Sequence, residues 1–265
     1  MPTRLRVGAV TYLNTKPLVF QFQRFAPHAE LSFDLPSRLA DDLAASRLDV
    51  ALIPSIEYCQ NSAYSIVSNA CIACRGPVLS VKLFCRVPAR EIRSIALDEG
   101  SRTSAALARI LLKERFDLTP RLTPLPIGTS LTDVDSDAVL VIGDRAIYSP
   151  PASFAEVWDL GDQWCRWVGL PFVFAMWVAR AGIDFRELEP AFAEARDCGV
   201  ANLEQIAERE AALLGLTVPQ CLAYLRDHLH FYLGQRERSG LELFFKKAGA
   251  LGLAPQRAYF SSAVA

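Results

Sequence analysis

Side chains that donate and accept hydrogen bonds follow two apolar strands of this chain, where each strand gives way to a turn. Asn14 comes after the apolar run that ends at Val10, and Ser55 and Ile56 follow the β-branched run that ends at Pro54. In an open α/β sheet, ligands bind at the carboxyl edge of the strands, against helix N-termini. These residues therefore predict a site for a small polar molecule. The alternative for Asn14 and Ser55 is a plain helix cap.

Hydroxyl groups cluster at a third junction between a strand and a helix. Ser101, Thr103 and Ser104 follow a predicted strand over 94–97 and open a strong helical pattern. One hydroxyl is enough to cap a helix, so three of them beside the free N–H groups of a helix start favour a carboxylate as ligand. Ser80 lies at the entry to a longer strand-like run, where it is either a ligand-binding hydroxyl or an exposed strand serine.

Gly143 and Asp144 end another short apolar run, over 138–142. Asp144 is either a helix cap or a residue at the lip of the site. Together the candidate residues supply amides, hydroxyls and helix ends, which bind anions well but are poor general acids and bases. A reaction at such a site would therefore depend on a substrate that brings its own base or its own leaving group.

The sequence lacks the residue patterns of a catalytic triad, of a nucleotide-binding loop and of a metal site. The three histidines, His28, His228 and His230, lie away from the strand-to-helix junctions, which argues against a Ser-His-Asp triad. There is no P-loop, no Gly-x-Gly-x-x-Gly and no His-Glu-x-x-His pattern, so we expect neither a cofactor nor a metal. Cys71 and Cys74 have the spacing of a redox or zinc pair, but without further ligands two small core residues are favoured.

The overall composition predicts a globular protein with a sizeable core. Of the 265 residues, 51% are hydrophobic and 22% are charged, and a net charge of −1 gives no reason to expect nucleic acid as a partner. The longest apolar run, over 170–179, is too short for a membrane span, and the N-terminus lacks the pattern of a signal peptide. We therefore expect a cytoplasmic protein that binds a small molecule, without membrane association or an obligate protein partner.

The elements that must position these residues can be predicted from the apolar patterns. Strand, helix, strand, helix and strand follow one another at the start of the chain, which predicts a parallel sheet with right-handed crossovers. Predicted strands cover 4–11, 30–35, 49–53, 78–87, 94–97, 138–142 and 172–179. Predicted helices cover 14–25, 36–46, 105–116, 157–167, 185–198, 203–214, 218–233 and 236–251.

This order of elements predicts an α/β protein of two lobes with a central cleft. The first lobe comprises 1–87 and 176–265 and carries the C-terminal helices, and the second lobe, 88–175, is inserted into it. Two strand-like crossings, over 81–87 and 172–179, would form the hinge. Each lobe is expected to hold a mixed sheet flanked by helices, and the ligand is expected between the lobes, since domain interfaces are favoured ligand sites.

Six segments in a fixed order resemble one enzyme family, the chorismate dehydratases of the futalosine route to menaquinone. Any one of them is weak evidence, but six in order are specific, and they span almost the whole chain. They read Tyr-Leu-Asn-Thr-Lys-Pro-Leu at 12–18, Asp-Val-Ala-Leu-Ile-Pro-Ser-Ile-Glu-Tyr at 49–58, Gly-Pro-Val-Leu-Ser at 76–80, Ser-Arg-Thr-Ser at 101–104, Val-Ile-Gly-Asp at 141–144 and Gly-Leu-Pro-Phe-Val-Phe-Ala at 169–175.

The resemblance implies a type II periplasmic-binding-protein-like fold in a cytoplasmic hydro-lyase. The reaction it implies converts chorismate to 3-[(1-carboxyvinyl)oxy]benzoate and water. The catalytic asparagine of the family falls on Asn14 and its catalytic serine on Ser80, while the hydroxyl pair of the second lobe falls on Thr103 and Ser104. We expect the enolpyruvyl carboxylate of the substrate to serve as the base, because the resemblance brings no protein base to the ring.

Two alternative functions remain open at this point. One is an enzyme similar to the 1,4-dihydroxy-6-naphthoate synthase of the same route, which the resemblance associates with a histidine in the cleft, and this chain has none between residues 29 and 227. The other is a non-catalytic solute-binding protein, which would normally carry an export signal.

Overall fold

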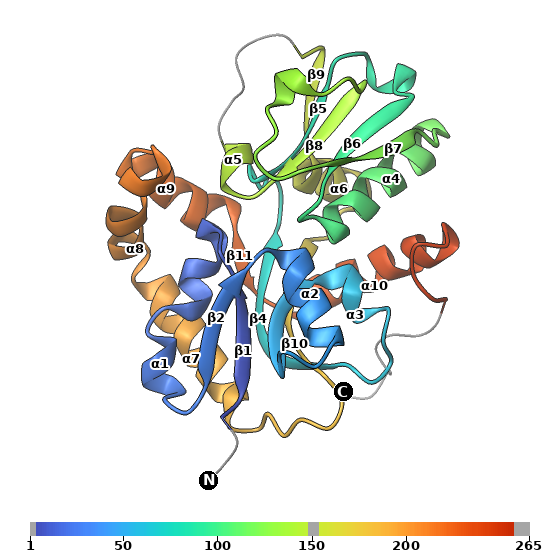
Figure 1. The fold of residues 1–265 in the computed structure, drawn as a ribbon. Coiled ribbons are helices and arrows are strands. Elements are labelled where there is room, and N and C mark those ends of the chain that lie inside the picture. The colour runs from blue at the N-terminus through green and yellow to red at the C-terminus, as the bar shows by residue number, and fades with distance from the viewer. Residues whose placement is uncertain (1–3, 148–153, 257–265) are drawn as a thin grey trace.

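A computed structural model describes residues 4–147 and 154–256, and within them the chain forms two sheets, each flanked by helices (Figure 1). The larger sheet has the strand order β11-β4-β10-β3-β1-β2, and the smaller has the order β7-β6-β8-β5-β9. In the larger sheet β1 is parallel to β2 and β3, whereas β10 is antiparallel to β3 and β4. In the smaller sheet β6 is parallel to β7 and β8, and β5 is antiparallel to β8 and β9. The predicted α/β class with two mixed sheets is confirmed.

The lobe around the larger sheet holds most of the helices. Its strands are β1 (Arg6–Val10), β2 (Glu30–Asp34), β3 (Val50–Pro54), β4 (Ser65–Cys74), β10 (Phe172–Ala179) and β11 (His230–Tyr232). Its helices are η1 (Leu13–Val19), α1 (Phe22–Phe25), α2 (Pro36–Ala44), α3 (Ser55–Tyr58), α7 (Leu188–Ala201), α8 (Leu203–Glu210), η4 (Ala212–Leu214), α9 (Val218–Ala223), η5 (Tyr224–His228) and α10 (Gln235–Ala250).

The lobe around the smaller sheet is built from the middle of the chain. Its strands are β5 (Val81–Cys85), β6 (Ser94–Asp98), β7 (Arg121–Leu125), β8 (Ala138–Ile142) and β9 (Glu156–Asp159). Its helices are η2 (Ala89–Glu91), α4 (Arg102–Phe116), η3 (Leu131–Asp133), α5 (Asp144–Ile147) and α6 (Leu160–Val168).

The start of the chain folds as its pattern predicts because every position of β3 is buried and α2 presents an apolar face. Leu39 and Leu43 of α2 are each 1% exposed, and they pack on the sheet beside β1. Gly8 of β1 allows this close packing, since a Cβ there would lie 2.7 Å from Leu39 Cδ2 and 2.5 Å from Leu48 Cδ1. The carboxyl ends of β1 and β3 therefore reach the same edge of the sheet with α2 packed over them.

Several predicted elements differ from the structure. The helix expected over 14–25 is divided into η1 and α1, because Gln21 adopts a left-handed conformation with φ 54°. The strand-like pattern missed β4, whose register shifts twice against β10 and which carries exposed polar residues. It also missed the edge strands β7, β9 and β11. The helix expected over 157–167 begins only at Leu160, because β9 occupies Glu156–Asp159, and the helix expected over 218–233 ends in the π-helix η5 before β11.

The crossings between the sheets also differ from the expected hinge. β5 lies wholly in the smaller sheet and β10 wholly in the larger one. The chain therefore crosses between Cys74 and Val81 and returns between Asp159 and Phe172, outside the strands that were expected to form the hinge. The lobe boundaries at 87/88 and 175/176 stay a prediction, and residues 1–3, 148–153 and 257–265 of those ranges lie outside the described residues.

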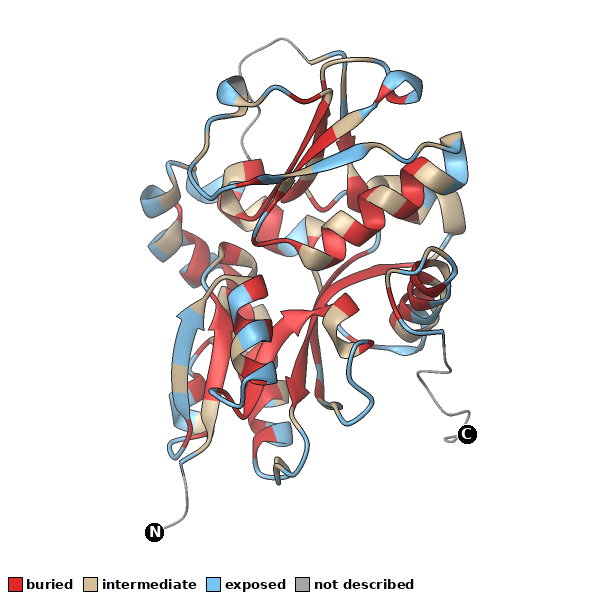
Figure 2. Cartoon of the chain, turned by 45° about the vertical axis from the view of Figure 1, so that its right-hand side comes forward, coloured by how far each residue is buried: buried red, intermediate tan, exposed pale blue. Residues whose placement is uncertain are grey.

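Aromatic side chains join the helices to the larger sheet. Trp164 of α6 is fully buried and makes edge-on contacts with Phe172 of β10 and Phe244 of α10 at centroid distances of 5.3 and 6.2 Å. Trp177 stacks on Phe192 of α7 at 4.1 Å. Figure 2 shows the buried residues concentrated along the strands and the inner faces of these helices. These rings are core packing, so they hold the sheet that carries the candidate residues.

The cysteines fit the expectation of free thiols. Cys71 and Cys74 are both fully buried in β4 and are not disulfide-bonded, as two small core residues would be. Burial raises the pKa of the Cys71 thiol well above its usual range. Within residues 4–147 and 154–256, no helix combines the length and the apolar character needed to cross a membrane.

Candidate active site

A cavity lies between the two lobes and is lined by residues from both of them. The first lobe contributes Tyr12 and Asn14, and the chain crossing contributes Ser80. The second lobe contributes the start of α4 over 101–104, together with Gly143 after β8. Of the predicted site residues, this cavity brings together Asn14, Ser80, Ser101, Thr103, Ser104 and Gly143, whereas Ser55, Ile56 and Asp144 are not among its lining residues.

Asn14 lies inside η1, and its side chain does not cap that helix. The N-cap residue of η1 is Tyr12, and no side chain caps the helix there. The amide Oδ1 of Asn14 accepts a hydrogen bond from Thr15 Oγ1 at 3.3 Å, and Thr15 is fully buried. Because the carbonyl end of the amide is held in this way, its amino group is left to donate. The capping alternative for Asn14 is therefore wrong.

Ser80 is held by the chain crossing that carries it. The Asp159 carboxylate accepts hydrogen bonds from the N–H groups of Val78 and Leu79, at 3.0 and 2.7 Å. Leu79 has a φ of 60°, a left-handed conformation that a branched residue adopts only where its surroundings impose it. Ser80 itself is 1% exposed, and its carbonyl accepts from Gly143 N–H at 2.9 Å. The alternative of an exposed strand serine is therefore wrong.

Thr103 joins the two lobes through its hydroxyl. Its Oγ1 accepts from the Ile56 N–H at 3.2 Å and lies 3.4 Å from Ser55 Oγ. Ser55 in turn donates to the Val173 carbonyl at 2.8 Å, so its side chain does not cap α3. Ser55 and Ile56 thus reach the cavity through Thr103. Their predicted role in substrate binding stays a prediction.

Ser101 and Ser104 line the cavity at the N-terminus of α4. Ser101 occupies the N-cap position, but no side chain caps the helix. Both serines are buried, at 6% and 4% exposure. The α4 helix has 15 residues, and the uncapped N–H groups of its first turn carry partial positive charge. This arrangement is suited to a carboxylate.

Asp144, which follows Gly143 in the chain, also connects the lobes. Its Oδ1 accepts from the Leu13 N–H at 2.9 Å. Burial raises the pKa of this carboxyl to about 6, although the hydrogen bond from Leu13 and the charge of Lys16 act to lower it. Gly143 has a φ of +71°, and a Cβ there would lie 2.7 Å from the Tyr12 ring, so glycine lets this ring reach the second lobe.

The pattern of residue types did not single out Arg102, which lines the cavity between the predicted hydroxyls. Its guanidinium bonds Asp41 at 2.7 Å and Glu57 at 3.3 Å, and both carboxylates belong to the first lobe. Together with Thr103 and Asp144, this cation holds the lobes closed on one another. The only signal in the sequence was a cationic residue inside a run of hydroxyls, and that signal is weak alone.

Groups suited to metal or imidazole chemistry are absent from the cavity wall. His28 is exposed, His228 bonds the Pro77 carbonyl at 3.0 Å, and His230 lies 3.5 Å from Glu237. In the part of the chain that the structure describes, no three His, Cys, Asp or Glu side chains come together as a metal site. The described cavity therefore offers amides, hydroxyls, helix N–H groups and one arginine.

Two sheets joined by two chain crossings, with a cavity between them, define a two-lobed fold of the periplasmic-binding-protein-like class. The fold is similar to that of the periplasmic aliphatic sulphonate binding protein SsuA from Escherichia coli, with a TM-score of 0.62 and 15% identity over 97% of this chain and 96% of that one. Residues 5–250 match the model of the menaquinone biosynthesis family, and the chain belongs to this family.

Two relatives share most of the length of the chain. The chorismate dehydratase of Thermus thermophilus is 32% identical over 93% of this chain and 95% of that protein. The chorismate dehydratase of Campylobacter jejuni is 25% identical over 93% of this chain and 99% of that protein. The family predicted from the six ordered segments is confirmed.

Proposed function

We propose that this protein is a chorismate dehydratase, a hydro-lyase that converts chorismate to 3-[(1-carboxyvinyl)oxy]benzoate and water in menaquinone biosynthesis. The observation that carries this proposal is the 32% identity with the Thermus thermophilus chorismate dehydratase over 93% of the chain. The site adds independent support, because a dianionic substrate suits a cavity lined by hydroxyls, helix N–H groups and Arg102.

The dehydration needs a proton and a hydroxide to leave the cyclohexadiene ring. Loss of both makes the ring aromatic and supplies much of the driving force. The enolpyruvyl carboxylate of the substrate takes the ring proton, so the protein need not provide a base. The residues lining the described cavity fit this requirement, since they include neither a histidine nor a carboxylate.

Asn14 and Ser80 are the residues that we assign to the reacting ring. The Asn14 amino group donates to the departing hydroxyl or to the carboxylate that acts as base. The Ser80 hydroxyl orients the same region of the substrate. Closure of the lobes holds these groups in place and excludes water, so the cost of arranging the reactants is met on binding.

The second lobe binds a substrate carboxylate in this proposal. Ser101, Thr103 and Ser104 supply hydroxyls at the start of α4, where the N–H groups of the first turn add partial positive charge. Gly143 and Asp144 form the wall that closes against η1, through the Asp144 bond to Leu13. Ser55 and Ile56 support this closure from the first lobe through Thr103.

Two alternative functions are less well supported. An enzyme similar to 1,4-dihydroxy-6-naphthoate synthase would need the cleft histidine that the family resemblance associates with it, and none lines the described cavity. A non-catalytic solute-binding protein would bind chorismate and leave it unchanged. We further propose a cytoplasmic location and no obligate protein partner, which fractionation of cells and light scattering of the pure protein would test.

The decisive experiment is incubation of the purified protein with chorismate, followed by chromatography and mass spectrometry of the product. We expect one aromatic product whose mass is lower than that of chorismate by one water. Activity should be the same after treatment with a chelator. Chorismate that is bound and recovered unchanged would support the solute-binding alternative. Activity that is lost with the chelator and restored by one metal would overturn the metal-free mechanism.

A further inference from the structure

Tyr224 has a buried hydroxyl group that lacks a hydrogen bond of ordinary geometry. It is the first residue of η5, and only 1% of its surface is exposed. The hydroxyl oxygen is inaccessible and has no hydrogen-bond partner. Buried hydroxyls in proteins are nearly always paired, so one without a partner in a described, well-packed region requires an explanation.

Two side chains of the proposed active site face this hydroxyl. Ser80 and Asn14 are both close enough to act on the pKa of the Tyr224 phenol by hydrogen bonding, which lowers it. Burial has the larger effect, and together with the charge of Asp144 it raises the pKa of Tyr224 far above its usual range. The phenol therefore stays neutral at physiological pH. A hydrogen bond that lowers the pKa of a phenol is donated to its oxygen, so Ser80 and Asn14 face Tyr224 as donors.

The backbone around Tyr224 is fixed against the crossing that carries Ser80. Residues 224–228 form a π-helix, a wide turn that occurs frequently at functional sites. At the end of this turn, His228 Nδ1 bonds the Pro77 carbonyl at 3.0 Å, three residues before Ser80. Leu225, the second residue of the same turn, is fully buried. The phenol is thus held behind Asn14 and Ser80, and it is not itself among the residues that line the cavity.

We infer that Tyr224 is a positioning residue for the proposed dehydration, and that its hydroxyl orients Asn14 and Ser80 from behind. The inference rests on the proposed function. With substrate bound, the phenol oxygen accepts from the Asn14 amide NH₂ or from the Ser80 hydroxyl. Thr15 already donates to Asn14 Oδ1 at 3.3 Å. With Oδ1 held by Thr15 and one N–H held by the phenol oxygen, the Asn14 amide directs its second N–H at the substrate. A serine that donates to Tyr224 keeps its oxygen free to accept from the substrate.

The first test compares Tyr224→Phe with Tyr232→Phe. Removing the Tyr224 hydroxyl should lower kcat by roughly tenfold to a hundredfold, as for other lost positioning groups, while KM changes by less than about threefold. The melting temperature should stay the same or rise, because the hydroxyl has no partner to lose. Tyr232 is the matched control, since its hydroxyl donates to Asp197 at 3.1 Å on an exposed part of the chain. An unchanged kcat in Tyr224→Phe would overturn the inference.

A double-mutant cycle tests whether Tyr224 acts through the two side chains that it faces. The Tyr224→Phe change is measured in the wild type, in Ser80→Ala and in Asn14→Ala. If the phenol works by orienting these groups, its removal should have little further effect once the group it orients has gone. Independent, multiplicative losses of kcat in both backgrounds would contradict a positioning role.

A third measurement does not depend on turnover. In ¹⁵N-labelled protein, the side-chain amide signal of Asn14 can be assigned by its disappearance in Asn14→Ala. We expect this signal to shift in Tyr224→Phe and to stay in place in Tyr232→Phe. If the wild type fails to dehydrate chorismate, the proposed function fails, while this signal still decides whether Tyr224 orients Asn14. An Asn14 signal that does not move in Tyr224→Phe would overturn the inference, whatever the activity.

Discussion

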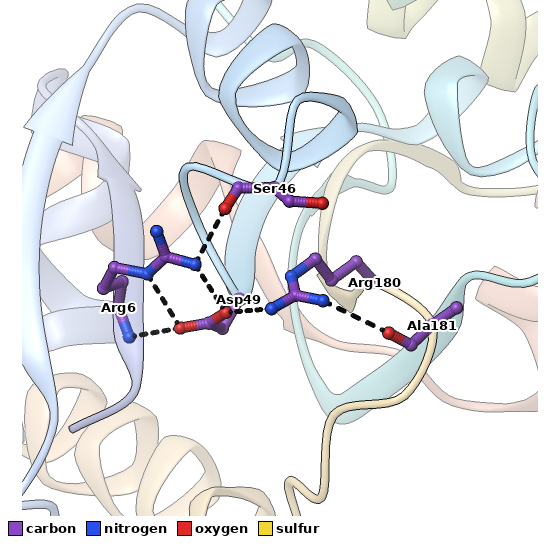
Figure 3. A network of polar contacts seen from close by, with 5 residues as sticks. All are labelled: Arg6, Ser46, Asp49, Arg180 and Ala181. Carbon is purple, nitrogen blue, oxygen red and sulfur yellow. Dashed lines mark hydrogen bonds and ion pairs between the residues drawn. The ribbon is translucent and has the colours of Figure 1, made fainter. Parts of the chain in front are cut away.

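The two ends of the larger sheet differ in how completely their buried polar groups are paired. At the amino ends of β1 and β3, Asp49 is 4% exposed and binds two arginines, Arg6 and Arg180 (Figure 3). Arg6 donates from its backbone N–H and its Nε to Asp49 Oδ2 at 3.0 Å, and Arg180 donates to Oδ1 at 2.7 Å. At the carboxyl ends of the same strands, Asp144 closes on η1 with one backbone N–H, and the Tyr224 hydroxyl has no partner.

The aspartate carboxyls at the two ends, Asp49 and Asp144, therefore have different pKa values. Burial acts to raise the pKa of Asp49, but hydrogen bonds from Arg6 and Arg180 outweigh it and bring the value to about 2. The pKa of Asp144 is raised to about 6, because burial is opposed mainly by a single backbone N–H and a lysine charge. Fully paired charge stabilises the fold at the end away from the cavity. Incompletely paired groups lie at the end nearer the cavity.

The largest effect that we predict at the cavity end of the sheet concerns Asn14. If it positions the reacting groups, Asn14→Ala should lower turnover by on the order of a hundredfold or more, while the protein stays folded. The change removes no helix cap, since the side chain caps nothing in η1. Asn61→Ala is the matched control, because Asn61 lies on the surface and bonds only its local turn. Steady-state kinetics with chorismate measures the effect.

Asn14→Asp probes the same position with a charge of the wrong sign for a dianionic substrate. We expect weaker binding, with part of the turnover retained if the new carboxylate acts as a base. Full activity in a well-folded Asn14→Ala protein would exclude Asn14 from the mechanism and leave Ser80 as the leading residue.

At the opposite end of the sheet, Asp49→Ala should destabilise the protein without a direct effect on the reaction. Breaking a buried pair by removing one partner costs about 3–5 kcal/mol. Because the side chains of Arg6 and Arg180 are 42% and 27% exposed and stay partly hydrated, we expect about 2–3 kcal/mol in urea unfolding. Asp184→Asn is the control, since its bond to Arg186 lies between exposed side chains and should contribute little. A loss of turnover in the folded Asp49→Ala protein would contradict the assignment of Asp49 to stability alone.

The hydroxyls at the start of α4 should affect substrate binding more than stability. Thr103→Val combined with Ser104→Ala removes two donors, and charged hydrogen bonds are worth roughly 1.5–3 kcal/mol each. KM should therefore rise by about tenfold or more for each contact that is lost. Part of the effect arises from weaker closure, because Thr103 also accepts from the Ile56 N–H. Ser104→Ala alone separates the two effects, and an unchanged KM in both variants would assign these hydroxyls to the lobe contact only.

The local patterns of the sequence predicted the early strands and helices well. The runs at β1, β2, α2 and β3 have the right periods and lie close together in the chain, so the local pattern and the fold agree. The edge strand β11 and the bulged strand β4 were missed because their pairing depends on distant partners. The helix breaks at Gln21 because this residue adopts a left-handed conformation. Glycine and asparagine are the residue types that would indicate such a conformation in the sequence, and neither occurs at this position.

For the site, residue types predicted which groups line the cavity but not how they are paired. Asn14 was found from its place after a strand, Ser80 from its place at the entry to one, and both from their motifs. The sequence could not show that Thr103 accepts from Ile56, since these residues lie on different lobes. It also could not find Tyr224, which lies in a segment predicted as ordinary helix and reaches the site only through a π-turn. Local sequence patterns therefore identify the candidate site residues, whereas long-range contacts determine the role of each one.

The smallest effect that we predict concerns the pH dependence of stability at Asp144. A carboxyl whose pKa is about 6 in the folded protein and 3.8 when unfolded binds its proton more tightly when folded. Its contribution to stability is therefore present below about pH 4 and is lost as the pH rises to about 6. Asp144→Asn keeps an oxygen that can accept from Leu13 but has no charge to titrate. The unfolding free energy of the wild type minus that of Asp144→Asn should fall by on the order of 1 kcal/mol between pH 4 and 6.5.

Urea unfolding of both proteins at several pH values measures this difference, and subtraction removes the opposite trend that Asp49 contributes at lower pH. Asp49 stabilises the folded state above the unfolded pKa and loses that effect as the pH falls toward its folded value of about 2. A difference that stays flat or rises between pH 4 and 6.5 would mean that Asp144 is as well paired as Asp49. In that case the incomplete pairing at the cavity end would be confined to the neutral groups, and the contrast in carboxyl pKa between the two ends of the sheet would be lost.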